Sequence, residues 1–238
     1  MTELLYLPDN NYQKKFDAKV TKSDETSNYV CLNQTLFYKE GGGQPADKGV
    51  LTWNGNESKV TDVQKEHGEI RHYIEGEVPD EDVQVQGEVD WDRRYKHMRM
   101  HTAQHVVSKV VLDEYGGTTA GNQIHEDKSR IDFEPVDFDE EDVEKIERMT
   151  NQRLKKNLEV EKKEMEREKV EEKIEEGRTN LDLIPDYVDP LRVVIIGDND
   201  LCPCGGTHVD NTEEVGTINI IERTSKGKDV ERLEFELD

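Results

Sequence analysis

The first ninety residues alternate short apolar runs with polar turns. Runs rich in β-branched and aromatic residues, separated by Gly, Asn and Asp, are typical of strands. Asn54-Gly55 is a strong signal for a two-residue hairpin turn. The pattern predicts strands at Phe16–Val20, Tyr29–Leu32, Thr35–Tyr38, Val50–Trp53, Lys59–Val63, Ile70–Ile74 and Val83–Val89. Many short strands in one segment favour a small β-barrel.

A helix is predicted next, from about Asp92 to Tyr115. Apolar residues and histidines occupy more than one of its faces, which indicates a helix that is buried on most sides. Gly116-Gly117 can end it, because glycine adopts the left-handed conformation that closes many helices. One face carries Met98, His101, His105 and Leu112, and another carries Ala103, Val106, Val107, Val110 and Val111.

The second half of the chain contains a heavily charged stretch, residues 139–176. Two apolar stripes run through it, Val143 to Leu154 and Val170 to Ile174, so the pattern alone fits one long solvated helix or a coiled coil. Heptads are not sustained, which excludes the coiled coil. Strands are predicted around this stretch at Ser129–Glu134, Arg192–Ile196, Gly216–Arg223 and Val230–Leu237.

The chain is strongly acidic, with 55 Asp and Glu against 32 Lys and Arg and a formal net charge of −23. Such a charge gives a soluble acidic surface, and it favours a halophilic-type protein adapted to high internal salt. Phosphates repel an acidic chain, so any contact with RNA must use local basic clusters. The candidates are Arg93, Arg94, Lys96 and Arg99, with Lys226 and Lys228 near the C-terminus.

Cysteine usage and hydropathy indicate the compartment. The three cysteines are Cys31, Cys202 and Cys204, an odd and sparse set that argues against a disulfide framework. We find no apolar run that resembles a signal peptide or approaches the ~20 residues of a membrane helix. The sequence therefore predicts a cytoplasmic protein that does not enter a membrane.

Two short motifs carry the candidate chemistry. His101-Thr-Ala-Gln-His105 and Cys204-Gly-Gly-Thr-His208 each place two metal-binding side chains four residues apart. Positions i and i+4 lie on the same face of a helix. Together the motifs supply three nitrogens and one sulfur, a set that suits tetrahedral Zn²⁺. Thr102 replaces the glutamate that a metalloprotease helix needs beside its first histidine, which excludes that class.

The residues around these motifs resemble a known family. The segment from Arg94 to Ser108 resembles the metal helix in the editing domains of alanyl- and threonyl-tRNA synthetases, and Cys202-Pro-Cys-Gly-Gly-Thr-His-Val209 resembles their second metal motif. Gly41-Gly-Gly-Gln-Pro-Ala-Asp-Lys-Gly49 resembles a glycine motif found on the alanine side of that family. The chain is most similar to free-standing alanyl-tRNA editing proteins in their longer form, and the resemblance covers nearly all of it.

The resemblance implies an α+β fold with two domains. Residues 1–90 would form the β-barrel with the glycine motif, and residues 91–238 an α/β editing domain with a zinc site between a helix and a sheet loop. It also implies a break in the charged stretch, with a strand near Leu158 to Met165 and a second helix up to Gly177. The expected zinc ligands are His101, His105, Cys204 and His208.

The implied reaction is hydrolysis of the ester between a wrong amino acid and tRNA for alanine. Seryl-tRNA is the expected substrate, glycyl-tRNA a second one, and DNA is not an expected partner. Thr102, Gln104 and Gln123 are hydrogen-bonding candidates for the substrate near the metal, although helix packing or plain surface roles fit them equally. Gly42, Gly43 and Gln44 are expected to contact the tRNA end, or else to form a tight turn between barrel strands.

Other functions stay open at this point. The chain could be a zinc-stabilised RNA-binding module without hydrolytic activity. It could also edit a threonine-accepting tRNA, although the threonine branch of the family lacks the glycine motif. The number of ligands is a further open point, because catalytic zinc usually keeps a free position and structural zinc usually has four protein ligands.

Overall fold

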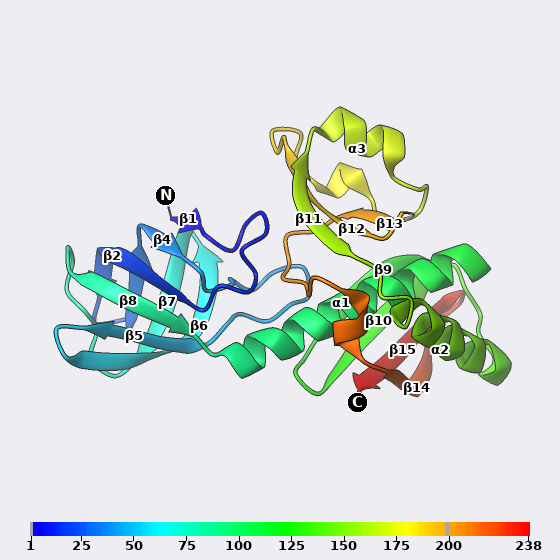
Figure 1. Cartoon of the computed structure of the whole chain (residues 1–238), viewed down its shortest axis with the longest axis horizontal. Coiled ribbons are helices and arrows are strands. Elements are labelled where there is room, and N and C mark those ends of the chain that lie inside the picture. Colours follow the sequence, from blue (N-terminus) through cyan, green and yellow to red (C-terminus); the bar gives the residue numbers. More distant parts are fainter. Residues whose placement is uncertain (1, 199) are drawn as a thin grey trace. The chain divides into compact units, whose positions relative to one another are not determined.

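The chain folds into two compact units, one up to Tyr95 and one from Lys96, in a computed structural model (Figure 1). The structure describes residues 2–198 and 200–238. It combines a closed barrel, two further sheets and helices, so the predicted α+β class is confirmed. The predicted division into domains at residue 90 stays a prediction.

The first unit is a closed six-stranded barrel, drawn in blue to cyan in Figure 1. Its strands pair in the order β2-β3-β7-β6-β5-β8, and all of the pairs are antiparallel. A short parallel pair, β1 and β4, lies outside the barrel sheet. The bounds are β1 Glu3–Leu4, β2 Lys15–Asp24, β3 Tyr29–Leu32, β4 Gln34–Thr35, β5 Gly49–Trp53, β6 Asn56–Glu66, β7 Glu69–Glu75 and β8 Gln84–Val89.

Alternation of apolar and polar residues along the strands fills the barrel interior. Strand β8 alternates strictly between exposed and buried residues, which is the period of two that a one-sided strand requires. Asn54 and Gly55 both have positive φ, as the predicted hairpin turn between β5 and β6 demands. The strand predicted at Thr35–Tyr38 is wrong beyond Thr35, because Phe37 and Tyr38 are buried in an irregular segment and not in a strand.

A buried ion pair organises this irregular segment. The Asp47 carboxylate accepts a hydrogen bond from the backbone N–H of Tyr38 at 2.6 Å. It also forms a hydrogen-bonded ion pair with the guanidinium of Arg94. Arg94 also donates to the backbone oxygens of Asn11 at 3.1 Å and Leu36 at 2.6 Å. The prediction that Arg94 contacts RNA is therefore wrong, since its side chain is completely buried and its donors are used within the unit.

The second unit is built around helix α1, Trp91–Tyr115, whose first turn belongs to the first unit. From Met98 to Val111 nearly every residue is buried, as the apolar positions predicted. Gly116, at φ +67°, ends the helix as expected, and its N–H donates to the carbonyl of Leu112 at 2.9 Å. No helix in the described residues is long and apolar enough to cross a membrane.

Two sheets complete the second unit. One has the order β14-β15-β10-β9 and the other β11-β12-β13. A small apolar cluster joins α3 to β12 through Val170, Leu191 and Val193. The bounds are β9 Thr118–Ile124, β10 Lys128–Glu134, α2 Glu140–Leu154, β11 Val160–Met165, α3 Arg167–Lys173, η1 Leu181–Leu183, β12 Leu191–Ile196, β13 Asp200–Pro203, η2 Thr212–Val215, β14 Ile218–Gly227 and β15 Val230–Leu237.

The charged stretch is broken as the family resemblance implied. Helix α2 begins at a capping box, in which Asp139 and Asp142 each accept the backbone N–H of the other. It ends at Leu154, strand β11 follows, and α3 forms the second helix. The prediction of a strand near Leu158 to Met165 is confirmed within two residues, whereas α3 ends four residues before Gly177.

Burial of His72 in the barrel predicts acid sensitivity of the first unit. Burial lowers its pKa from 6.5 to about 4. As the pH falls below 6.5, the His72 imidazole binds a proton in the unfolded chain but stays neutral in the folded chain. The free energy of unfolding is therefore highest above pH 6.5 and decreases until about pH 4. We expect a loss of about 3 kcal/mol.

His72→Asn supplies the control, because asparagine does not titrate and can still donate to the carbonyl of Val30, which lies 3.3 Å from the His72 Nδ1. Urea unfolding at pH 7, 5.5 and 4 gives the difference in unfolding free energy between wild type and variant. That difference should shrink with falling pH. A constant difference would mean that His72 is not buried neutral.

Candidate metal centre

Four side chains from distant parts of the second unit meet at one point. His101, His105, Cys204 and His208 each offer one ligand atom, and these atoms all lie within 4.8 Å of one another. The Cys204 Sγ lies 3.5 Å from the His101 Nε2 and 3.3 Å from the His208 Nε2. These are the four residues whose spacing suggested a metal site. Cys202 is not part of the cluster.

Local structure fixes each of the four. His101 and His105 are one turn apart on α1, so both side chains project from the same face of the helix, with their ring centroids 5.2 Å apart. Cys204 follows directly after β13. Its N–H donates to the Arg192 carbonyl at 3.1 Å, and the Arg192 guanidinium donates to the Cys204 carbonyl at 2.6 Å. The loop then returns His208 to the helix, with its ring centroid 4.3 Å from that of His101.

Burial sets the protonation of the cluster. It lowers the pKa of His101 to about 3, and Arg192 and His97 add to this shift. Burial also holds the pKa values of His105 and His208 well below the usual value. All three imidazoles are therefore neutral near pH 7, which is the form that binds metals. Burial raises the pKa of the Cys204 thiol, so the thiolate forms when a cation is present to stabilise it.

Thr102 orients one of the rings. Its hydroxyl lies 3.1 Å from the His208 Nδ1 and accepts the backbone N–H of Val209 at 3.3 Å. A histidine whose Nδ1–H donates to an oxygen keeps its Nε2 lone pair for a metal. Thr102 is completely buried, which leaves the hydroxyl committed to this contact.

A second buried ion pair lies beside His105, and no sequence pattern indicated it. Arg178 forms hydrogen bonds of 2.6 and 3.1 Å to the Asp200 carboxylate, and both side chains are almost fully buried. The same guanidinium lies 3.4 Å from both the Nδ1 and the carbonyl oxygen of His105. Arg178 thereby joins the segment after α3 to strand β13 and to the metal helix.

The donor set suits a metal ion. Three imidazole nitrogens and one thiolate are borderline-soft ligands, which select late transition metals over Mg²⁺ or Ca²⁺. The four ligand atoms are close enough to share one ion, and hydrogen bonds to Thr102 and Arg192 already orient His208 and the backbone of Cys204. The cluster could therefore hold a metal ion.

Comparison with known proteins agrees with this geometry. Residues 6–93 match the class II (A) tRNA synthetase family, and residues 191–234 match the second additional domain of threonyl and alanyl tRNA synthetases. The alanyl-tRNA editing protein AlaX-M of Methanosarcina barkeri is 40% identical over 243 residues, covering 100% of this chain and 99% of that protein. The chain belongs to the alanyl-tRNA editing protein family.

Longer proteins contain the same unit. The alanyl-tRNA editing protein AlaX-L of Pyrococcus horikoshii is 36% identical over 99% of this chain and 58% of its own length. The alanine–tRNA ligase of Thermococcus kodakarensis is 41% identical over 98% of this chain, which corresponds to 25% of the ligase. The similarity extends over both units in each case, so the barrel belongs to the family unit as much as the metal centre does.

The predicted substrate residues of the second unit lie in different surroundings. Gln104, on α1, is mostly buried, and its Oε1 accepts the side-chain N–H of Asn122 at 3.1 Å. Gln123 is exposed on β9 and accepts from Arg130 at 3.1 Å. Of the three candidates, Thr102 is the one in contact with a cluster ligand. Their roles toward a substrate stay predictions.

The glycine motif lies in the first unit. Gly42 and Gly43 have φ of +58° and +80°, and Gly41 and Gln44 exchange two backbone hydrogen bonds around them. The tight-turn interpretation is thus confirmed, and Gln44 is completely buried. Contact of these residues with tRNA stays a prediction.

The basic residues that were candidates for contact with RNA differ in the contacts that their side chains make within the protein. Lys226 and Lys228 are exposed at the turn between β14 and β15, and Lys96 is exposed 3.9 Å from Glu126. Arg93 donates to the carbonyl of Ala46, and Arg99 donates to the carbonyls of Val215 and Asp238. The two arginines therefore have structural contacts that the sequence pattern did not reveal.

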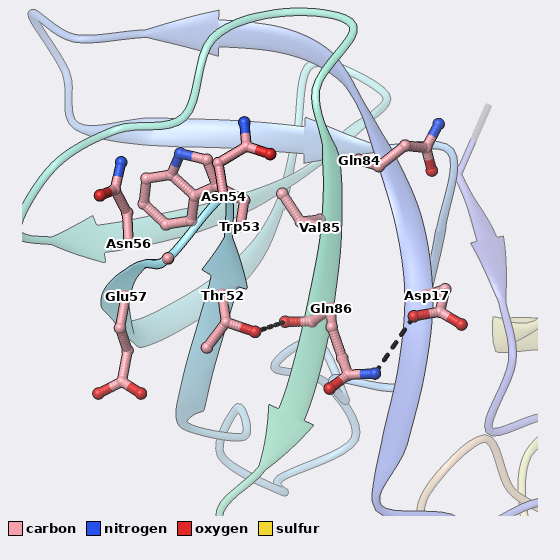
Figure 2. Close-up of a pocket in the computed structure, with 10 residues that line it drawn as sticks. Asp17, Thr52, Trp53, Asn54, Asn56, Glu57, Gln84, Val85 and Gln86 are labelled. Atoms are coloured by element: carbon pink, nitrogen blue, oxygen red, sulfur yellow. Dashed lines mark hydrogen bonds between the residues drawn. The ribbon is translucent and has the colours of Figure 1, made fainter.

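One wide hollow lies on the barrel (Figure 2). It has a volume of about 740 Å³ and is lined by Asp17, Thr52, Trp53, Asn54, Gly55, Asn56, Glu57, Gln84, Val85 and Gln86. The Gln86 side-chain amide donates to the Asp17 carboxylate at 3.3 Å, a hydrogen bond drawn as a dashed line in Figure 2. The lining contains no histidine or cysteine, and among the described residues the group that could hold a metal ion is the cluster of the second unit.

Proposed function

We propose that this chain is a trans-editing hydrolase that deacylates mischarged tRNA for alanine, with a zinc ion held by His101, His105, Cys204 and His208. The observation that carries the proposal is the buried cluster of three histidines and one cysteine in a chain of the alanyl-tRNA editing family. A metal ion bound there supplies a Lewis acid that activates water and polarises an ester carbonyl.

The chain's own residues prepare this site in three ways. Thr102 holds His208 in one orientation, and Arg192 fixes the backbone of Cys204. Burial keeps the imidazoles neutral, so no proton must leave them before a cation binds. Arg178, which is ion-paired with Asp200, lies 3.4 Å from the His105 Nδ1 and helps to hold that ring in place.

Ligand number bears on the mechanism. Four protein ligands are typical of structural zinc, and an open position is typical of catalytic zinc. We propose that one of the four positions is exchangeable, so that the substrate or water reaches the ion. Measuring coordination number by X-ray absorption, with and without a non-hydrolysable seryl-tRNA analogue, tests this point, and an unchanged four-ligand shell in both states contradicts it.

Substrate selection gives a direct test. We expect seryl-tRNA for alanine to be deacylated at least about 10-fold faster than alanyl-tRNA, because a site that hydrogen-bonds the serine hydroxyl leaves buried polar groups unpaired when alanine binds. Deacylation of Ser-, Gly- and Ala-tRNA for alanine should be measured side by side, with metal content determined on the same sample. Equal rates for serine and alanine would indicate an unselective esterase.

The same assay, extended to seryl-tRNA for threonine, separates the competing functions. A zinc-stabilised RNA-binding module would bind tRNA and leave all three esters intact. An editing enzyme for threonine-accepting tRNA would hydrolyse seryl-tRNA for threonine in preference to seryl-tRNA for alanine. Metal removal and reloading with Zn²⁺ should abolish and restore the activity, and activity that survives full metal removal would contradict a zinc-dependent reaction.

A further inference from the structure

Strand β14 forms one edge of the four-stranded sheet β14-β15-β10-β9 in the second unit (Figure 1). The outer side of an edge strand presents backbone N–H and C=O groups that have no neighbouring strand. In the first half of β14, helix α2 satisfies these groups. Asn151 exchanges two hydrogen bonds of 2.9 Å with the backbone of Ile218, and the Glu147 carboxylate accepts the N–H of Ile220 at 2.7 Å. In the second half, every residue of 221–227 other than Thr224 is exposed.

The direction of the backbone groups in this exposed half follows from the pairing with β15. In an antiparallel ladder, successive residues direct their N–H and C=O groups alternately toward the neighbouring strand and away from it. The hydrogen bonds to α2 show that the groups of Ile218 and Ile220 are directed away from β15. One extra residue follows Ile220 in a β-bulge, which shifts the alternation by one position. Beyond the bulge, the outward groups are therefore those of Arg223 and Ser225.

The exposed half of β14 is complementary to itself. When two copies of the strand lie antiparallel and centred on Thr224, Glu222 of each copy faces Lys226 of the other, and Thr224 faces Thr224. Opposite charges and threonine pairs are favourable across antiparallel strands. In the same register, the outward backbone groups of Arg223 meet those of Ser225 of the second copy. The hydrogen bonds and the side-chain pairs thus require one and the same alignment.

Glu222 and Lys226 keep their charges available for such a contact. Neither forms an ion pair with another described residue, although the Glu222 carboxylate accepts a hydrogen bond from the Thr224 hydroxyl at 3.1 Å. A lysine on an edge strand usually discourages pairing with a further strand, because pairing would leave its charge without a counter-charge. The antiparallel register removes this obstacle, since it places a glutamate opposite the lysine at both symmetric positions.

We propose that the exposed half of β14 binds a second copy of this chain by antiparallel strand pairing centred on Thr224. This inference does not rest on the proposed function, because no residue of the metal cluster lies in β14. The paired segment is short, and each copy carries a net charge of −23, so the dimer is weak. Salt should strengthen it, because repulsion over distances longer than the Debye length is screened more than the contact between paired side chains.

Sedimentation equilibrium of the full chain, from low micromolar to near-millimolar protein in about 0.15 M and about 1 M KCl, measures the dimer. Glu222→Lys and Lys226→Glu each place like charges opposite one another twice, so each should weaken the dimer about 10-fold. The double variant restores two pairs of opposite charges and should return the dissociation constant close to that of wild type. Glu172→Lys, exposed on α3, is the matched control for the change in net charge.

A second set of measurements tests the backbone contact. Ser225→Pro removes one outward N–H from each copy, and proline is tolerated on edge strands, so the variant should fold and dimerise less. Amide hydrogen exchange at Arg223 and Ser225 should slow as the protein concentration rises. Exchange at Ile220 should not change, because its N–H already donates to Glu147. Thermal unfolding checks that all variants fold.

The outcomes separate strand pairing from other causes of association. Loss of the dimer in both single variants with recovery in the double variant supports the proposal. A monomer at every concentration in both salts overturns it and leaves this edge to a strand of another protein. A dimer that is insensitive to the charge reversals and to Ser225→Pro also overturns it, because the contact then lies elsewhere. A stronger dimer in Glu222→Lys with a weaker one in Lys226→Glu would show that net charge controls association, and the proposed register would be wrong.

Discussion

Replacing Cys204 by alanine should remove the metal and abolish deacylation. Cys204 is the one thiolate donor of the cluster and lies against both His101 and His208. Loss of an outer partner of a metal ligand typically reduces affinity or activity 10–100-fold, so loss of the thiolate itself should cost more than about 100-fold in both. Metal per chain after dialysis against a weak chelator, together with the initial rate on seryl-tRNA, measures the effect.

Cys202→Ala is the matched control. Its thiol is buried two residues away, and burial raises its pKa to about 12. It lies outside the cluster, so its removal should leave a small cavity, cost on the order of 1 kcal/mol of stability, and leave the metal in place. Equal metal loss from both variants would mean that the ligand within Cys-Pro-Cys has been wrongly chosen.

The parts of the site that were predictable depend on local spacing. The i,i+4 histidine pair and the Cys-x-x-x-His loop have fixed separations in sequence, and the structure joins them as that spacing suggested. Barrel strands with strict alternation, such as β8, were predictable for the same reason. Strand β9 was missed because Thr118–Ile124 contains Gly and Asn, which disfavour strands, and it forms through pairing with β10.

Contacts between residues that are distant in sequence were not predictable. Arg178 reaches His105 across 73 positions and Asp200 across 22, and no periodicity relates them. The contact of Arg192 with Cys204 was unpredictable for the same reason, because it arises from the pairing of β12 with β13. The prediction that Arg94 contacts RNA, which was based on charge alone, was wrong for the same reason. An arginine on a predicted helix is usually solvated, and only the fold places a carboxylate against this one.

Replacement of Arg94 should have a large effect on the stability of the first unit. Arg94→Met should destabilise the first unit by about 3–5 kcal/mol, because it leaves the Asp47 carboxylate buried without its counter-charge. Arg94→Lys should also destabilise it, since one ammonium cannot replace a guanidinium that contacts the carboxylate and two backbone carbonyls at once. Urea unfolding of each variant beside wild type measures the loss.

Two further variants separate this structural role from a contact with RNA. Arg94→Met combined with Asp47→Leu should recover part of the stability, because a buried ion pair replaced by apolar groups leaves no isolated charge. Recovery should stay partial, since the carbonyls of Asn11 and Leu36 lose their donor. Lys96→Ala, an exposed position two residues later on α1, should stay within about 0.5 kcal/mol of wild type. If Arg94→Met unfolds like wild type and only weakens tRNA binding, the arginine contacts RNA, and its burial against Asp47 does not describe the protein in solution.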